Sequence, residues 1–456
     1  MRDGHARTSL PRTGGATAGA QPFCTSRWNA SAIRPGWGSG AALTALAACT
    51  AAFALTAPAA ASTVLHALLW PTFGLSAGLR LTAAAVSRRC EAPAPDLPED
   101  ALPTYTILAP LYREHRVAAQ LVDAIARLDY PADRLQVLLV LEPDDAETWP
   151  ALAALHLPAC FEIFVAPPGS PRTKPRACNE ALEHARGEFL VIYDAEDRPE
   201  PRQLREAAAR FRADPEVSCL QAPLRIDRAR TFLQRQFALE YAAQFEVMLP
   251  GLHRLGAPFP LGGSSNHFRT AVLRELGGWD AYNVTEDADL GFRLAAAGHR
   301  TGLLRTPTWE IAPRGSGAWL RQRGRWLKGH LQTWCVHMRR PGPGGWPRLL
   351  GLQATLGLGL VSAFAHAPLL LLLLFELSRS GANGRAYALA FAGAGWGVSV
   401  LVMALGAGRR NLPFRWSDAL GAPLYWPLHT IAAVRAVIEW FRRPFHWDKT
   451  DHRPVR

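Results

Sequence analysis

The chain has 456 residues, a length that suits one large domain with additional segments. Its 50 basic and 38 acidic residues give a formal net charge of +12, while 49% of the residues are hydrophobic and 19% are charged. This composition excludes a disordered chain and a highly charged coiled coil, and it indicates a protein that is part soluble and part membrane-embedded. The cysteines are scattered without a Cys-x-x-Cys pair, so neither a disulfide framework nor a zinc ribbon is indicated.

The N-terminal region is predicted to form a basic tail and a transmembrane hairpin. Residues 1–40 are rich in Gly, Ala, Ser, Thr and Arg without an apolar period, so we expect a disordered tail. No Asp, Glu, Lys or Arg occurs at 35–79, which leaves room for two crossings of about 20 residues each. We place the hairpin at 41–88, with crossings near 41–57 and 63–86. The flanking arginines predict that both ends of the hairpin lie in the cytoplasm.

A soluble domain is predicted at 104–315, after a linker rich in Pro and acidic residues. Apolar runs of strand length alternate there with helical periods, at 117–128 and 175–185 among others. The runs are YTILAPL at 105–111, QVLLVL at 136–141, FEIFVA at 161–166 and EFLVIYDA at 188–195. Strands that alternate with helices predict an α/β fold with a Rossmann-like, mostly parallel sheet.

A second membrane region is predicted at 349–442. Two uncharged stretches, 349–375 and 386–408, are expected to cross the bilayer. The segment 416–442 contains two prolines, and we expect a bent or re-entrant segment rather than a fifth crossing. A full crossing would place the basic tail at 443–456 outside, against the positive-inside tendency.

Three carboxylates, Asp194, Glu196 and Asp197, follow the predicted strand at 188–195. Ligands of open α/β sheets bind outside the carboxyl ends of the strands. Because neighbouring carboxylates repel one another, a hard divalent cation that bridges diphosphate oxygens fits this position. The alternative is an ordinary helix start, where acidic residues are favoured.

A second acidic group, Thr285-Glu286-Asp287, precedes a helical stretch at 288–297. One interpretation makes Thr285 the N-cap of this helix, with the acidic residues in its first turn. The other makes one carboxylate a general base that deprotonates a hydroxyl.

The segment 316–345 is basic and amphipathic, and it carries the sequence Gln-Arg-Gly-Arg-Trp at 322–326. It is predicted to form interfacial helices on anionic lipid. Its guanidinium groups also suit a leaving diphosphate, and its indole suits a sugar ring. The small-residue loop at 261–266 is either an ordinary turn or a place where the backbone approaches a sugar closely.

The order of these motifs resembles the family 2 glycosyltransferases, and within them the membrane-bound, cellulose-synthase-like, processive-type group. The pattern is an acidic strand end followed by Pro199, then Thr-Glu-Asp, then Gln-x-x-Arg-Trp, between transmembrane segments. The resemblance implies a GT-A catalytic domain inserted between N- and C-terminal transmembrane helices. Residue 324 is Gly, a poor helix residue, so we expect a loosened helix at this motif.

The resemblance also assigns roles to residues. Asp287, with Glu286 beside it, matches the catalytic base, and Asp194 matches the first metal-binding Asp. Glu196 stands where the second Asp usually lies and Asp197 is its neighbour, so the second metal ligand stays open. The residues that resemble nucleotide-sugar contacts are Pro110, Tyr112, Glu114, Glu142, Asp144 and Lys174. Those that match diphosphate and acceptor contacts are Gly263, Ser264, Gln322, Arg323, Arg325 and Trp326.

The implied activity is an inverting, membrane-embedded β-glycosyltransferase that uses a nucleoside-diphosphate sugar, with a UDP-sugar favoured and Mg²⁺ or Mn²⁺ as cofactor. Its expected product is an exopolysaccharide or another cell-surface polysaccharide. The first alternative is transfer of one sugar to a lipid acceptor, which makes a glycolipid or a polyprenyl-phosphate sugar. The second alternative is a non-catalytic membrane scaffold or transporter, although the predicted crossings contain few ionisable residues.

The expected partners are the lipid bilayer, the nucleotide sugar and its acceptor, and a partner subunit is left open. The resemblance places the chain in a bacterial-type inner or plasma membrane, as a multi-pass protein with a cytoplasmic catalytic domain. Nucleic acid is not an expected partner, because the soluble part has no basic stripe with interleaved aromatic residues.

Overall fold

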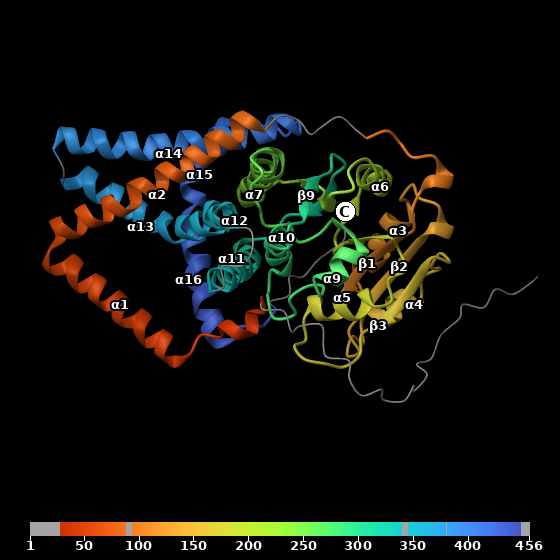
Figure 1. Cartoon of the computed structure of the whole chain (residues 1–456). Coiled ribbons are helices and arrows are strands. Elements are labelled where there is room, and N and C mark those ends of the chain that lie inside the picture. Colours follow the sequence, from red (N-terminus) through yellow and green to blue (C-terminus); the bar gives the residue numbers. More distant parts are fainter. Residues whose placement is uncertain (1–27, 88–93, 340–344, 380, 448–456) are drawn as a thin grey trace, which may run out of the picture.

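A computed structural model describes residues 28–87, 94–339, 345–379 and 381–447 of the chain. An α/β domain occupies one side of the molecule, and long apolar helices extend from its other side (Figure 1). The segments predicted as the ends of the basic tails, 1–27 and 448–456, lie outside the described residues.

The main sheet has seven strands in the order β3-β2-β1-β4-β8-β6-β9 within the described residues. The first four are parallel to one another, β8 is antiparallel to both of its neighbours, and β9 is parallel to β6. The predicted GT-A-type fold with a mostly parallel sheet is confirmed. The strands are β1 (Tyr105–Leu111), β2 (Leu135–Leu141), β3 (Phe161–Val165), β4 (Phe189–Ile192), β6 (Val217–Gln221), β8 (Asn266–Arg269) and β9 (Arg300–Leu303).

A smaller sheet has the order β5-β10-β7, and helices cover both faces of the main sheet. The short strands are β5 (Arg198–Pro199), β7 (Leu224–Asp227) and β10 (Thr308–Ile311). The domain helices are α3 (Ala118–Ala126), α4 (Thr148–Ala153), α5 (Lys174–Leu182), α6 (Gln203–Ala213), α7 (Phe232–Ala243), α8 (Leu249–Arg254), α9 (Thr270–Glu275) and α10 (Glu286–Ala296).

The core has two layers because successive side chains of a strand point to opposite faces of the sheet. On β1, Ile107 packs in one cluster with Leu121 of α3 and Leu204 of α6. The next residue, Leu108, packs in the other cluster with Ala177 of α5 and Leu290 of α10. This alternation fixes which helices lie on each face, and it places the N-termini of α5 and α10 on the same face.

The strand predicted at 188–195 is shorter than expected, because β4 ends at Ile192. The chain turns immediately afterwards, and the Asp197 N–H donates to the Asp194 carbonyl at 3.1 Å. The acidic residues therefore lie in a tight turn outside the end of the strand.

The Gln-x-x-Arg-Trp motif lies on one helix, α11 (Ser316–Arg339), which is continuous through Gly324. The expectation that Gly324 loosens this helix is wrong. A Cβ at Gly324 would lie 3.2 Å from Cδ of Arg435, on α16 (Pro427–Arg442), so the glycine serves close packing between the two helices.

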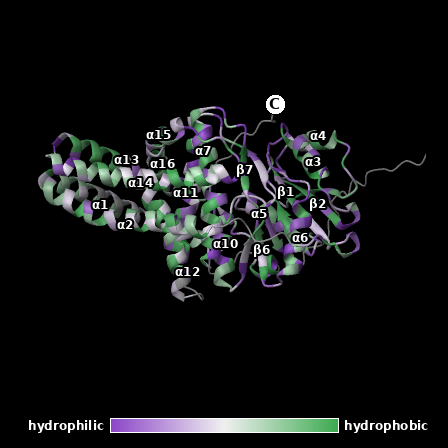
Figure 2. Cartoon of the chain, turned by 90° about the horizontal axis from the view of Figure 1, so that it is seen from above, coloured by the Kyte–Doolittle hydropathy of each residue, from purple (hydrophilic) through white to green (hydrophobic). Residues whose placement is uncertain are grey.

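Three helical segments of the described residues are long and apolar enough to cross a membrane: Gly38–Thr56, Arg348–Arg379 and Ala382–Arg409. Together with α2 they project from the α/β domain, with hydrophobic residues along them (Figure 2). The crossing predicted near 63–86, within α2, is not one of these three segments and stays a prediction. The helices concerned are α1 (Trp37–Thr56), α2 (Pro58–Val86), α12 (Gly345–Leu352), α13 (Leu358–Arg379) and α14 (Ala382–Arg409).

The segment predicted to bend, 416–442, forms two helices, α15 (Trp416–Tyr425) and α16, which meet at Trp426. A proline follows at the start of α16, where its missing N–H costs no helical hydrogen bond. Because α16 packs against both α11 and α13, it connects the motif helix to the apolar bundle.

The segment before α1 differs from the disordered tail that we predicted for residues 1–40. Trp28 is buried, and a short 3₁₀ helix, Ala30–Ile33, follows it. The Trp28 ring stacks on His337 of α11 with centroids 4.8 Å apart. Burial of a large aromatic ring stabilises this segment against α11, an effect that a composition-based prediction misses.

Candidate active site

Four segments that contain predicted site residues lie close together at one edge of the main sheet. The acidic turn after β4 lies between the N-terminus of α5 and the loop before β8, and α10 begins nearby. The parallel strands β1 and β4 bring their carboxyl ends to this edge. The edge is the expected ligand position of an open α/β sheet.

The carboxylates of Asp194 and Asp287 approach each other beside Gly263. A Cβ built on Gly263 would lie 3.6 Å from Asp287 Oδ2 and 4.0 Å from Asp194 Oδ2. Glycine therefore leaves open the space between the two carboxylates. The structure brings together two motifs that are more than 90 residues apart in the sequence.

Lys174, the first residue of α5, lies among these carboxylates. Its Nζ donates to Asp194 Oδ1 and, at 3.3 Å, to the Gly263 carbonyl, and it lies 3.8 Å from Glu286 Oε1. Burial would lower the pKa of Lys174, but Asp194 and Glu286 more than offset burial and hold this pKa above its usual value. The lysine is therefore a fixed positive charge within the acidic site.

The two acidic residues at the start of α10 hold protons more tightly than free carboxylic acids. Burial raises the pKa of Glu286 to about 7, while Lys174 opposes the increase and Asp287 adds to it. Burial also raises the pKa of Asp287. Thr285 is the N-cap residue by position but makes no side-chain capping bond. A carboxylate with a pKa near neutrality suits general base chemistry.

Asp197 holds the acidic turn together. It is fully buried, and its Oδ2 accepts hydrogen bonds from the Asp194 N–H at 2.7 Å and from the Ser264 hydroxyl. Burial raises its pKa well above the usual range. Since Ser264 is engaged by Asp197, both side chains stabilise the turn, and Asp194 and Glu196 are the turn carboxylates with exposed surface.

No group of three His, Cys, Asp or Glu side chains within the described residues is close enough to hold a metal ion alone. Mg²⁺ usually takes one or two protein carboxylates and completes its shell with water and substrate phosphates. Asp194 Oδ2 accepts no hydrogen bond from the described part of the chain, and its side chain is 30% exposed. The turn therefore fits a divalent cation bound together with a nucleotide sugar.

The predicted nucleotide-binding residues line the ends of β1 and β2. Glu142 forms an ion pair with Arg176 at 2.8 Å, and Asp144 forms one with Arg172 at 3.0 Å. These pairs connect the end of β2 to α5 and to the segment before it, close to Lys174. Pro110 lies on β1, and Tyr112 and the buried Glu114 lie in the loop that follows.

Asp145 is a positioning residue that the sequence reasoning missed. Its Oδ2 accepts from the Arg113 N–H at 2.7 Å, and its Oδ1 accepts from the Thr148 N–H at 2.9 Å. It thereby fixes the loop that contains Tyr112 and Glu114. One feature of the sequence could have indicated this role. Asp145 lies three residues before Thr148, where α4 begins, and an Asp at such a spacing is typical of helix starts.

The two arginines of the Gln-x-x-Arg-Trp helix have different surroundings. Arg323 forms an ion pair with Glu240 of α7 at 2.5 Å, and its guanidinium carbon lies 4.8 Å from the Trp326 ring centroid. Arg325 Nη1 donates to the Val284 carbonyl at 3.1 Å, beside the Thr-Glu-Asp motif. Arg325 therefore lies near the acidic site, while Arg323 belongs to the packing of α11 against α7.

Glu240 is a second residue that the sequence reasoning missed. Besides Arg323, it accepts hydrogen bonds from the Tyr425 hydroxyl at 2.7 Å and from His429 Nε2 at 2.9 Å. Burial alone would raise its pKa, but Arg323 and His429 lower that pKa to about 2. Glu240 thus connects α7 to α11 and to the junction of α15 and α16. Little in the sequence indicated this role, because Glu240 is a single acidic residue of α7 that belongs to none of the recognised motifs.

Trp326 and Gln322 are the other predicted site residues of the motif on α11. The Trp326 ring packs against Phe237, with centroids 6.0 Å apart and planes within 26°. Gln322 Oε1 is buried and accepts no hydrogen bond from any described residue. A buried amide oxygen without a donor is costly unless a ligand or water supplies one.

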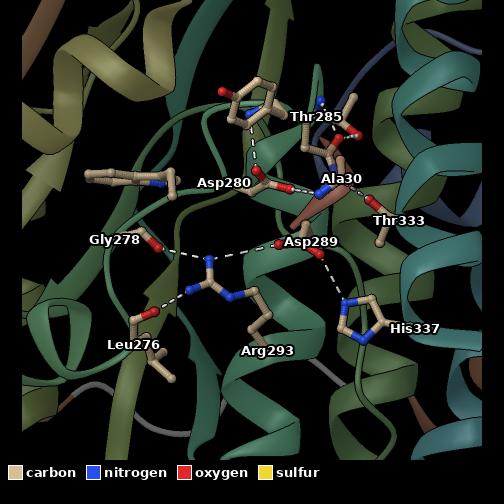
Figure 3. Close-up of polar contacts among 12 residues, drawn as sticks. Ala30, Leu276, Gly278, Asp280, Thr285, Asp289, Arg293, Thr333 and His337 are labelled. Atoms are coloured by element: carbon tan, nitrogen blue, oxygen red, sulfur yellow. Dashed lines mark hydrogen bonds and ion pairs between the residues drawn. The ribbon is translucent and has the colours of Figure 1, made fainter. Parts of the chain in front are cut away.

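Buried polar contacts hold α10 against α11 (Figure 3). His337 Nε2 lies 2.9 Å from Asp289 Oδ1, and Asp289 Oδ2 lies 3.8 Å from Arg293. Asp280 accepts from the Ala30 N–H at 2.7 Å, so the N-terminal segment joins the same region. None of these four side chains was predicted to act at the site.

The chain is similar to known glycosyltransferases over the domain that contains this site. Residues 103–329 match the model of "Glycosyltransferase like family 2". Probable glycosyltransferase YdaM of Bacillus subtilis is 26% identical over 233 residues, 50% of this chain and 56% of the relative. Beta-monoglucosyldiacylglycerol synthase of Synechocystis is 26% identical over 303 residues, 63% of this chain and 62% of the relative.

Two further similarities extend the comparison. Cellulose synthase 1 catalytic subunit of Komagataeibacter xylinus is 28% identical over 256 residues, 54% of this chain and 33% of the relative. The chain therefore spans less than two thirds of the length of each of these curated relatives. Among solved structures, the mannosyltransferase PcManGT of Pyrobaculum calidifontis, in complex with GDP-Man and Mn²⁺, matches with a TM-score of 0.54. At 22% identity, this match covers 83% of this chain and 98% of that one, and it supports the fold.

The family model matches the domain in which the acidic turn, the Thr-Glu-Asp motif and most of the motif helix lie together. The similarity to cellulose synthases agrees with the cellulose-synthase-like group that the motifs indicated. The fold is similar to that of the mannosyltransferase PcManGT. The chain belongs to glycosyltransferase family 2.

Proposed function

We propose that this enzyme transfers a sugar, with inversion, from a nucleoside-diphosphate sugar to a hydroxyl acceptor, and that it forms a β-linkage. The observation that carries the proposal is the approach of the Asp194 and Asp287 carboxylates beside Gly263, with Lys174 paired to Asp194 and 3.8 Å from Glu286. A UDP-sugar is the favoured donor. The favoured product is an exopolysaccharide or another cell-surface polysaccharide.

Asp287 is proposed as the general base. Its burial raises its pKa, so it binds a proton more readily than a free aspartate does. Glu286, with a pKa of about 7, is the preceding residue, and the positive charge of Lys174 lowers the pKa of both carboxyl groups. Asp287 would take the proton of the acceptor hydroxyl while the hydroxyl oxygen attacks the anomeric carbon and the bond to the diphosphate breaks. A direct displacement of this kind needs no covalent sugar–enzyme intermediate.

Asp194, together with Glu196, is proposed to hold Mg²⁺ or Mn²⁺ when the nucleotide sugar is bound. Such an ion would stabilise the negative charge of the departing diphosphate. Lys174 and Arg325 would contribute further positive charge on the same side, since both lie close to Glu286 and Asp287. Arg323 is left out of this role because Glu240 already neutralises it.

Trp326 and Gln322 are proposed to bind the acceptor. An indole face provides an apolar platform for a sugar ring. The buried Gln322 Oε1 needs a hydrogen-bond donor, which an acceptor hydroxyl supplies. The loop at Gly263 and Ser264 would let the donor sugar approach the backbone between the two carboxylates.

Transfer of a single sugar to a lipid acceptor is the second candidate. The Synechocystis relative is named as a beta-monoglucosyldiacylglycerol synthase, and its match extends over 63% of this chain. Both candidates use the same chemistry, so the site geometry does not separate them. We also propose that the chain is a multi-pass protein of a bacterial-type inner membrane, with the α/β domain on the cytoplasmic face.

The test is release of nucleoside diphosphate by the detergent-purified full chain. A panel of nucleotide sugars is offered with Mg²⁺, with Mn²⁺ or with a chelator, and with added membrane lipid. We expect release from one donor that depends on the metal and decreases in Asp287→Asn. A sizing column then separates polymer from glycolipid. Metal-independent release that Asp287→Asn leaves unchanged would contradict the proposed mechanism.

A further inference from the structure

A cavity of about 990 Å³ lies among the apolar helices, and none of its lining residues belongs to the candidate active site. It is bounded by α2, α13 and α14, with residues at the junction of α15 and α16 at one side. Its walls are mainly hydrophobic and include Leu69, Trp70, Phe73, Leu369, Leu373 and Phe391. Pockets of about 300–1,000 Å³ accommodate drug-sized molecules, so this one is large enough for a substantial ligand.

Arg80 of α2 places a positive charge in this apolar wall. Its one hydrogen bond within the described residues is a 3.5 Å contact from Nη1 to Ser399 Oγ, at the limit for such a bond. No described carboxylate lies within the 4.0 Å of an ion pair with Arg80. Glu240 attracts Arg80 from beyond that distance, and the one carboxylate of the lining is Glu376 of α13. A guanidinium in apolar surroundings is costly unless an anion neutralises it. The cavity therefore has room for hydrocarbon and a guanidinium that no described carboxylate contacts directly.

The charge lies at the end of the cavity nearest the catalytic domain. Ala83, three residues after Arg80, packs against α8, and a Cβ on Gly251 would lie 2.6 Å from Ala83 Cα. His66, also in the lining, lies about 21 Å earlier along the axis of α2. The cavity thus extends from the catalytic domain into the apolar bundle over a distance that suits lipid chains.

The same end of the cavity is close to the motif helix. Trp426 lines the cavity, and the residue before it, Tyr425, donates to Glu240 at 2.7 Å. Glu240 in turn holds Arg323 of α11. One layer of side chains therefore separates the head of the cavity from the helix that carries Trp326.

We propose that this cavity binds a phosphate-bearing lipid, with its hydrocarbon chains between α2, α13 and α14 and its phosphate on Arg80. The planar fork of a guanidinium matches phosphate oxygens in two-point hydrogen bonding. The mainly apolar walls favour acyl chains over a hydrated sugar polymer. The inference rests on the proposed membrane placement of α13 and α14, and it is independent of the sugar-transfer chemistry.

The test is equilibrium binding of radiolabelled dipalmitoyl phosphatidic acid to the full chain in nonionic detergent. Unlabelled dipalmitoylglycerol has the same chains without the phosphate, and glycerol 3-phosphate has the phosphate without the chains. We expect dipalmitoylglycerol to compete about tenfold more weakly than phosphatidic acid, and glycerol 3-phosphate not to compete. Equal competition by dipalmitoylglycerol and phosphatidic acid would overturn the assignment of Arg80.

Two matched pairs of variants locate the site. Arg80→Ala should weaken binding about tenfold, whereas Arg379→Ala, at an exposed arginine of α13 outside the lining, should not. Gly395 lines the cavity and Gly397 does not, and a Cβ on either meets nothing within 4 Å. Gly395→Leu should therefore abolish binding while Gly397→Leu preserves it. The same affinity in all four variants would exclude the cavity as the binding site.

The lipid result and the transfer result are separable. Asp287→Asn should bind phosphatidic acid like the unmodified protein, because Asp287 lies outside the cavity lining. If Asp287→Asn kept full transfer activity, the proposed base would be wrong while the lipid site stood. If transfer occurred as proposed but Arg80→Ala and Gly395→Leu bound lipid normally, the lipid site alone would be wrong.

Discussion

His337 Nε2 lies 2.9 Å from Asp289 Oδ1, and both side chains are completely buried. Asp289 is two residues beyond Asp287 on α10, and His337 is near the end of α11. Trp28 stacks on the His337 ring. The pair therefore joins the helix that begins with Thr-Glu-Asp to the helix that carries Gln-x-x-Arg-Trp, and the N-terminal segment covers the pair.

Replacement of His337 should disturb both stability and catalysis. His337→Leu leaves Asp289 buried with Arg293, 3.8 Å away, as its remaining ion-pair partner among the described residues, and loss of one partner of a buried pair costs about 3–5 kcal/mol. We expect a lower melting temperature in detergent and a lower kcat, with donor KM less affected. His337→Gln retains a side-chain donor and should recover part of both losses. Unchanged melting and kcat in His337→Leu would show that the contact is not needed.

Transfer should decrease as the pH falls through about 7. A general base acts in its ionised form, and Glu286, the neighbour of Asp287, has a pKa of about 7, so it takes up a proton at near-neutral pH. Burial also raises the pKa of Asp287, which favours its protonation as the pH falls. The rate of nucleoside diphosphate release, measured across the pH range, should therefore rise with pH and level off in alkaline solution.

Lys174 provides the check on this pH dependence. Its charge lowers the pKa of Glu286, so Lys174→Ala should shift the inflection of the pH–rate profile to higher pH. Arg172→Ala, at an exposed arginine two residues earlier, should leave the inflection in place. A profile that stays flat between acidic and alkaline pH would contradict the assignment of the base.

Gly329 should be intolerant of any side chain. A Cβ there would lie 2.2 Å from Thr285 Oγ1 and 2.7 Å from the Thr285 backbone nitrogen, so α11 would have to move away from the Thr-Glu-Asp motif. We expect Gly329→Ala to destabilise the protein by about 1–3 kcal/mol and to lower kcat. Gly317→Ala is the matched control on the same helix, because its Cβ meets only the end of Arg321, at 3.7 Å. Equal behaviour of the two variants in thermal unfolding and turnover would refute the close-packing argument.

Arg323 and Arg325 should respond differently to replacement. Arg325→Ala removes a charge next to the acidic site and should reduce kcat/KM for the donor about tenfold or more. Arg323→Ala removes the arginine paired with the partly buried Glu240 and leaves its hydrogen bonds to Tyr425 and His429, so it should mainly lower the melting temperature. Donor titrations and thermal unfolding of both variants check this. A larger loss of donor affinity in Arg323→Ala would reverse the two assignments.

Local patterns in the sequence predicted the catalytic domain well. The apolar runs at 105–111 and 136–141 predict β1 and β2 closely, since strand length and apolar content are local properties. The position of Asp194 after a strand was enough to predict its place at a sheet edge, because parallel strands end together there. The acidic residues of its first turn were enough to predict the helix that starts at Glu286.

The three-dimensional packing decided what the motifs left open. The sequence presents Glu196 and Asp197 as equals, but Asp197 is buried against Ser264 while Glu196 is partly exposed. It likewise presents Arg323 and Arg325 as a pair, but Glu240 engages only Arg323. Each distinction depends on a partner more than 60 residues away, which no local pattern specifies.

The sequence by itself thus determined the fold class, the family and the position of the acidic motifs, because these follow from periodicity and motif order along the chain. Only the tertiary structure decided that Trp28 and Ala30 pack against the catalytic domain and that His337 holds Asp289. It also revealed the cavity at Arg80. Burial and charge pairing are set by segments that are distant in sequence and meet only when the chain is folded.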